Sequence, residues 1–269
     1  MRVELADELE RLEDEGRTGV LRVGDGEFHL ADGAIASATC SRTTGLDRLV
    51  VEAGVASAED WERAGTGDPG PLLGRPLLET LALLAVFDAA YFLLPTPVVP
   101  EFRPAPAHWL SAVCTIRPRA LVRECARRGD PDSGPWPAEL VDRAAVVPVR
   151  RIRRRRVLLT GGQAEVLAAA DNRRSVTGIA RDLGRTAYGC LEAVRDLTVA
   201  GLIEPPVGAP ASDAGPPDAG PPAAGPSAGA EPPLRRRVRN ATPVPDGDEW
   251  EPVDHELLTR LRAALEDLA

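Results

Sequence analysis

The chain has no lysine, so all 32 of its basic residues are arginine. Aromatic residues make up only 4% of the 269 positions, and there are three histidines. His29, His108 and His255 fall in three separate segments, which leaves little material for a metal centre or an acid–base pair. No metalloprotease helix, nucleophile elbow or phosphate-binding loop motif occurs either. We therefore expect a protein that is not an enzyme, with no catalytic residue, no metal and no cofactor.

Long hydrophobic runs are also missing. No stretch of about 18 uncharged apolar residues occurs, which a membrane helix would need, and no early apolar run resembles a signal peptide. The four cysteines, at positions 40, 114, 125 and 190, contain no Cys-x-x-Cys pair. Reduced thiols are expected rather than a disulfide framework or a zinc site. The composition therefore predicts a cytoplasmic, soluble protein with no membrane partner.

The charge that is present is distributed unevenly. The chain has a net charge of −9, but residues 1–100 carry −10, residues 101–204 carry +6 and residues 205–269 carry −5. A basic middle between acidic ends favours either an anionic partner or docking within the chain. An arginine-rich surface that is simply solvated explains the pattern equally well.

Residues 1–100 carry the pattern of an α+β domain with a small antiparallel sheet. Asp25-Gly26 and Asp32-Gly33 are turn signals, because glycine tolerates the positive φ of a tight hairpin turn. They separate short segments that alternate between apolar and polar residues. In order, we predict a helix over 3–15, strands over 18–23, 27–31 and 34–40, helices over 45–52, 58–64 and 76–90, and a final strand over 91–94.

This order resembles the PATAN domain of bacterial signalling proteins. The resemblance lies in Arg17–Val23, in Phe28–Ala38, in Gly45–Leu49, and in a long helix followed by Tyr91–Leu94. It covers most of residues 1–100 through turn glycines, small residues and apolar strand positions. The sequence departs from the family where Ala89-Ala90 replaces a frequent glycine. The resemblance implies a protein-interaction module of signalling pathways and brings no catalytic residue with it.

Residues 149–204 predict three short helices and a strand. Thr160 and Gln163 have capping-box spacing, Ser175 and Thr186 can cap two further helices, and Gly184 and Gly201 can end them. Helix, helix, tight turn, helix and strand is the order of a winged-helix or helix-turn-helix unit. Residues 101–148 are predicted to be a helical connector. The block 101–204 as a whole resembles the C-terminal part of actinobacterial regulators that join a PATAN-type domain to a winged helix.

Residues 205–245 are rich in proline, glycine and alanine, and they predict a disordered linker. A C-terminal amphipathic helix is predicted within 246–269, because its leucines recur at helical spacing after a single tryptophan. This segment is a candidate for docking a protein partner, a second copy of the chain or the chain itself. The candidate partner contacts are Trp250, Leu257, Leu258, Leu261, Leu265 and Leu268.

Two functions compete. The first is a non-enzymatic regulatory and signalling adaptor that binds protein partners through the PATAN-like domain and the C-terminal helix. The second is a DNA-binding transcription regulator, in which the winged helix reads the groove and flanking arginines hold phosphates. Glu192 and Asp196 on the expected recognition helix disfavour DNA, so protein binding is placed first; a homodimer is compatible with both. The candidate nucleic-acid contacts are Arg151, Arg153, Arg173, Arg185, Tyr188 and Arg195.

Overall fold

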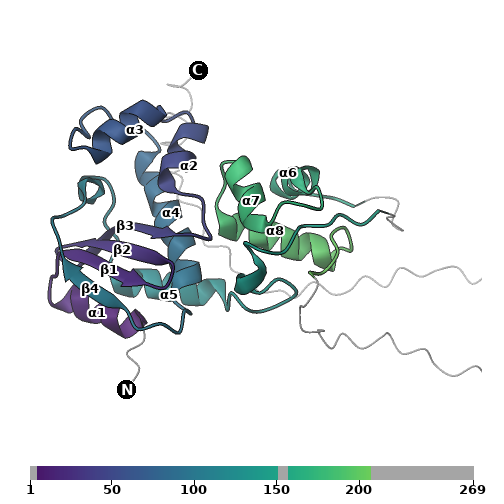
Figure 1. Ribbon diagram of the computed structural model, residues 1–269, viewed down its shortest axis with the longest axis horizontal. Helices are drawn as coiled ribbons and strands as arrows, with labels where there is room; N and C mark the ends of the chain where they lie inside the picture. The colour runs from purple at the N-terminus through teal and green to yellow at the C-terminus, as the bar shows by residue number, and fades with distance from the viewer. Residues whose placement is uncertain (1–4, 151–156, 207–269) are drawn as a thin grey trace, which may run out of the picture. The chain divides into compact units, whose positions relative to one another are not determined.

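A computed structural model describes residues 5–150 and 157–206, which belong to one compact unit of the chain (Figure 1). Helices and an antiparallel sheet are combined in it, so the predicted α+β class is confirmed. The elements are, in chain order, α1 (Leu5–Asp14), β1 (Gly19–Val23), β2 (Gly26–Ala31), β3 (Ala34–Cys40), α2 (Leu46–Glu52), α3 (Ala58–Gly65), α4 (Leu78–Leu93), β4 (Glu101–Pro104), the 3-10 turn η1 (Trp109–Ala112), α5 (Pro118–Arg128), the 3-10 turn η2 (Ala138–Leu140), α6 (Gly161–Ala169), α7 (Val176–Asp182) and α8 (Ala187–Val199).

The sheet has four antiparallel strands in the order β3-β2-β1-β4. Its first hairpin turns at Gly24 and Asp25, one residue earlier than predicted, because Val23 already pairs with Gly26. The second hairpin turns at Asp32-Gly33 as predicted, with φ values of 50° and 79°. On one face of the sheet the side chains of β1, β2 and β3 are buried, and α4 packs against β3 there (Figure 1).

The end of α4 differs from the prediction. Residues 91–94 do not form a strand, since α4 continues to Leu93 and the Leu94 amide still bonds to the Ala90 carbonyl at 3.0 Å. Neither glycine nor proline interrupts this apolar run before Pro95, so nothing stops the helix earlier. The fourth strand is instead β4, which pairs with β1 and lies in the segment that we predicted to be a helical connector.

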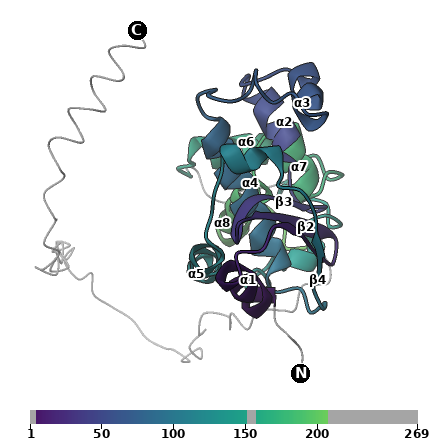
Figure 2. The same cartoon turned by 90° about the vertical axis from the view of Figure 1, so that its left-hand side faces the viewer.

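Residues from this connector complete the first part of the fold. Helix α5 packs beside α1, as Figure 2 shows. Arg119 of α5 bonds the Asp14 carboxylate of α1 at 2.7 Å, and the Arg119 backbone N–H donates to Glu13. The acidic face of α1 therefore meets a basic helix of the same chain. That residues 1–100 fold independently stays a prediction.

The caps and helix-ending glycines predicted in 157–206 are confirmed, but the strand predicted after the third helix is wrong, since Ile203 forms only an isolated bridge with Pro148 and Pro205 cannot donate the next strand hydrogen bond. Thr160 and Gln163 form the reciprocal capping box of α6. The Ser175 and Thr186 side chains accept from the N–H groups of Gly178 and Gly189, at the starts of α7 and α8. Positive φ values of 60° and 71° follow α7 and α8, at Gly184 and Gly201.

The segment just before the undescribed residues 151–156 also packs on these helices. The Val146 N–H bonds the Arg174 carbonyl, and the Val149 N–H bonds the Leu202 carbonyl, each at 2.9 Å. Residues 145–149 therefore lie between the start of α7 and the chain after α8, and they precede the predicted start of the winged-helix region. No helix in the described ranges is both long and apolar enough to cross a bilayer. The linker and the C-terminal helix, predicted over 205–245 and 246–269, lie outside the described residues apart from the first two.

Candidate functional site

Helix α8 occupies the position of a recognition helix in the predicted helix-turn-helix order. It packs against α6 and α7 and also against α4. Its surface is therefore covered from more than one side, and six of its 13 residues are buried. The buried members are Ala187, Cys190, Leu191, Ala193, Val194 and Leu197.

A carboxylate of α4 holds the first turn of α8. Asp88 is completely buried, and its two oxygens accept hydrogen bonds from the backbone N–H groups of Ala187 at 2.8 Å and Tyr188 at 2.7 Å. These N–H groups have no partner within their own helix. Burial raises the pKa of Asp88 to about 6, although both N–H bonds act to lower it. The start of α8 is thus tied to α4 by a charge-assisted contact.

Arg195 is also engaged within the chain. Its side chain is only 13% exposed. One terminal nitrogen donates to the Tyr91 hydroxyl at 3.3 Å and the Glu192 carboxylate at 3.1 Å. The other donates to the backbone carbonyls of Pro131 at 2.6 Å and Trp136 at 3.0 Å. Arg195 therefore joins α8 to the end of α4 and to the loop after α5.

The remaining candidates for nucleic-acid contact are distributed differently. The Tyr188 ring lies against Tyr91, with centroids 4.8 Å apart, and the Arg128 guanidinium lies 4.7 Å above it. Arg173 is exposed, and Arg185 pairs with Glu165 at 2.6 Å. The structure thus uses Tyr188 and Arg195 in internal contacts and leaves Arg173 and Arg185 at the surface. Arg151 and Arg153 lie outside the described residues, and so do the candidate partner contacts Trp250, Leu257, Leu258, Leu261, Leu265 and Leu268.

Contacts that sequence reasoning missed reinforce this arrangement. The turn after β3 is bonded to α7 and to the loop before α8. The Thr44 hydroxyl donates to the Arg185 carbonyl at 2.7 Å, and the Thr177 hydroxyl donates to the Arg42 carbonyl at 2.9 Å. The sequence did offer a hint of the Asp88 contact. Asp88 is the one charged residue in the apolar run 81–94, and a carboxylate that is buried must find hydrogen-bond partners.

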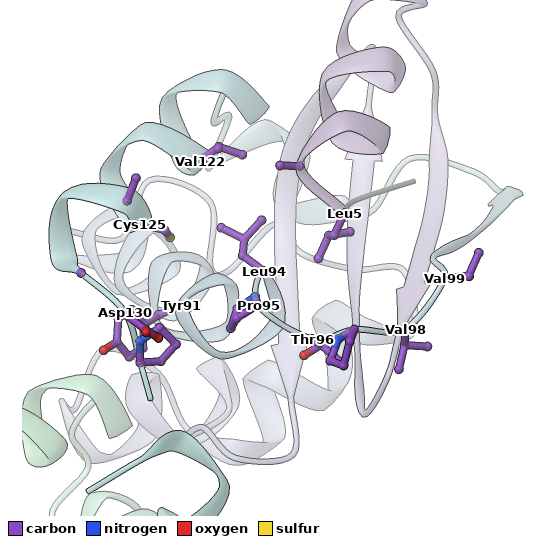
Figure 3. A pocket seen from close by; sticks show the side chains of 15 residues that line it. Leu5, Tyr91, Leu94, Pro95, Thr96, Val98, Val99, Val122, Cys125 and Asp130 are labelled. Carbon is purple, nitrogen blue, oxygen red and sulfur yellow. The ribbon is translucent and has the colours of Figure 1, made fainter. Parts of the chain in front are cut away.

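An apolar groove opens at the C-terminal end of α4, beside Tyr91 (Figure 3). It has a volume of about 560 Å³ and is lined by the first turn of α1, the loop after α4 and the end of α5. Val98 and Val99 of that loop are 47% and 70% exposed. In Figure 3, Leu94 and Val122 line the same hollow. We call this the α1–α5 groove. Such an apolar surface in water is typical of a binding site.

The histidines and cysteines of the described residues are engaged in contacts within the fold. His29 and His108, which the sequence places far apart, have ring centroids 4.8 Å apart. His29 contacts Glu27 at 3.2 Å, and the His108 Nδ1 accepts the Leu110 N–H. Within residues 5–150 and 157–206, no group of three metal-ligating side chains converges. Burial raises the pKa of all four cysteine thiols to about 11 or 12, which makes them poor nucleophiles.

No family model, curated protein or solved structure matches the chain. Its functional assignment therefore depends on the surfaces described above.

Proposed function

We propose that this chain is a non-enzymatic regulatory adaptor of the cytoplasm that binds a protein partner. The observation that carries the proposal is the attachment of α8 to α4 through Asp88 and Arg195. A helix that reads DNA must insert its side chains into the major groove. Here Tyr188 and Arg195 are held inside the chain, while Glu192 and Asp196 bring negative charge to the remaining surface of α8.

The partner would bind at the α1–α5 groove of the PATAN-like part. The groove is lined almost entirely by apolar side chains, and Thr96 and Asp130 are the main polar ones. Val98 and Val99 stand in water at 47% and 70% exposure, and an exposed apolar patch of this kind is typical of a protein-interaction site. In this proposal α6, α7 and α8 serve as a rigid platform. A further contribution from the C-terminal leucines stays a prediction.

Capture from a native lysate tests the proposal, with the full chain as bait and with or without nuclease. We expect a partner that is retained after nuclease treatment and is lost from the variant Val98→Asp, which places a charge in the groove. Val51→Asp is the matched control, because Val51 is 38% exposed on α2 and does not line the groove. Equal capture by both variants would remove the groove from the proposal.

The DNA-binding alternative is tested by the same protein. Fluorescence anisotropy with a labelled duplex should show no binding at physiological salt. Binding that is retained there and depends on the duplex sequence would overturn protein binding as the main function. Binding seen only at low salt, with a steep salt dependence and no sequence preference, would reflect arginine–phosphate contacts alone. Arg173→Ala and Arg185→Ala would identify those contacts.

A further inference from the structure

A second hollow lies where α4, α6 and α8 meet. It has a volume of about 450 Å³ and is distinct from the α1–α5 groove. Leu49 of α2, together with Leu81 and Leu84 of α4, lines it from one part of the fold. Val166 of α6 and the small residues Gly189 and Ala193 of α8 line it from the other. We call this hollow the α4–α8 cleft.

Helix α4 shows why the cleft lacks a cover. Leu81, Leu84 and Asp88 follow one another at spacings of three and four residues, which places them along one face of the helix. Asp88, at the end of this row, is covered by α8. Leu84, earlier in the row, is 43% exposed. The same face is therefore closed by a helix at one end and left in water at the other.

The cleft presents small residues beside these leucines. Gly189 and Ala193 stand one turn apart on α8, and a Cβ added at Gly189 would meet only the Thr186 hydroxyl of its own helix start. No other chain segment thus fills the space above Gly189 in the described ranges. Small residues allow the backbone of another helix to come close. An amphipathic helix that lays its apolar face into a groove is a recurring mode of recognition.

The charged residues around the α4–α8 cleft indicate which kind of helix could bind in it. Of the charged residues on α8, Arg195 is turned into the fold and pairs with Glu192 at 3.1 Å, while Glu192 and Asp196 both line the cleft. Asp196 accepts a hydrogen bond from the Gln163 amide at 3.0 Å and forms no ion pair with a described cation. Arg185, at the edge, is neutralised by Glu165 at 2.6 Å. Among the charged residues that line the cleft, Asp196 alone has no described partner of opposite charge, so the rim is acidic at this carboxylate.

We propose that the α4–α8 cleft binds an amphipathic helix of a partner protein. Its leucine-like stripe packs on Leu81 and Leu84, and a lysine or arginine residue faces Asp196. The inference rests on the proposed protein-binding function and specifies a second contact together with the chemistry of the partner. The acidic rim selects against nucleic acid and against acidic helices.

A pair of synthetic peptides tests the proposal on the full chain. The first is a labelled 15-residue helix with leucines at helical spacing and lysine at every polar position, and the second has glutamate in place of lysine. We expect the lysine peptide to bind roughly tenfold or more tightly than its acidic twin, which corresponds to about 1.4 kcal/mol. Because its ion pairs are exposed, this preference should shrink at high salt. Asp196→Asn should reduce it.

Two variants with equal exposure locate the binding site. Leu84→Asp should weaken binding of the lysine peptide at least roughly tenfold, since it places a charge in the apolar contact. Leu73→Asp is the control, because Leu73 is also 43% exposed and does not line the cleft. Circular dichroism of both variants checks that the fold is kept. An equal loss in the two variants would overturn the assignment to the cleft.

Other occupants would give different results. Equal binding of the two peptides would overturn the acidic-rim argument. A dimer that forms with concentration and is lost in Leu84→Asp would assign the cleft to a second copy. Tighter peptide binding by a chain that ends at residue 245 would assign it to the chain's own C-terminal residues. If neither peptide binds but nuclease-resistant capture at the α1–α5 groove persists, this inference fails and the proposed function stands.

Discussion

Replacing Asp88 by asparagine tests the contact on which the proposed function depends. Asp88→Asn keeps the size of the side chain and one carbonyl acceptor for the N–H groups of Ala187 and Tyr188. The new amide NH₂ faces the second N–H, so a donor meets a donor. The start of α8 should then loosen from α4, while the strand pairing of the sheet, to which Asp88 forms no hydrogen bond, should stay unchanged.

Opposing contributions set the size of the effect. A buried N–H without a partner costs about 1–3 kcal/mol, and a lost bond to a charged acceptor costs about 1.5–3 kcal/mol. Asparagine also removes the buried charge, and the pKa rise from 3.8 to about 6 corresponds to about 3 kcal/mol that is already net of the two N–H bonds. At pH 7 the loss and the gain therefore offset each other to within about 2 kcal/mol in the free energy of unfolding.

The pH dependence gives a sharper result than the difference at one pH. Because the pKa of Asp88 is raised in the folded state, its contribution to stability is fully present below its ordinary value of 3.8 and is lost as the pH rises through about 6. From pH 7 to pH 4, the parent chain should therefore gain about 2 kcal/mol relative to Asp88→Asn. Carboxylates with a lowered pKa, such as Glu124, act in the opposite sense, but they are common to both chains and cancel in the difference.

Urea unfolding of both chains between pH 4 and pH 7 measures this difference. Glu79→Gln, an exposed change on the same helix, serves as the control. The stability of the parent chain relative to this control should not change between pH 4 and pH 7. Amide hydrogen exchange at Ala187 and Tyr188 should become faster in Asp88→Asn alone. A stability difference that shrinks on acidification would refute the reasoning, because the two N–H bonds would then outweigh burial. Unchanged exchange at both amides would refute the role of Asp88 as the anchor of α8.

Three further predictions concern Arg195, two helix-ending glycines and the cysteines. Arg195→Ala should lower the free energy of unfolding by about 2–4 kcal/mol through its lost bonds to buried carbonyls, whereas exposed Arg173→Ala should change it by less than about 0.5 kcal/mol in the same urea assay. Gly184→Ala should cost about 2 kcal/mol, because φ is +60° and the new Cβ would lie 2.5 Å from the Glu52 Cβ. Gly201→Ala, with φ of +71° and no atom within 4 Å of the new Cβ, should cost about 1 kcal/mol, and equal losses would contradict the α2 contact. The four cysteines, whose pKa values are raised, should react slowly with a thiol reagent at pH 8 and fully in urea; rapid labelling of the folded chain would contradict their burial.

The sequence by itself determined the local features of the fold. Local features depend on atoms within a few residues of one another, so they can be predicted without the rest of the chain. These features are the caps at Thr160, Ser175 and Thr186 and the turn at Asp32-Gly33. The α+β class follows from the same patterns of turns and periodicity. Long apolar stretches were less informative, because an uninterrupted run fits a helix or a buried strand. That ambiguity explains why residues 91–94 were misassigned.

Only the tertiary structure decided what α8 can contact. Its sequence is compatible with a DNA-reading helix, and Tyr188 and Arg195 are residue types that contact nucleic acid. Their partners Tyr91 and Asp88 lie about a hundred positions earlier in the chain, and no local pattern specifies that the two segments meet. Hydrogen bonds between such distant residues depend on how the helices pack, because packing alone brings a buried carboxylate to the free N–H groups of another helix. The same packing leaves the leucines of α4 uncovered beside an acidic rim.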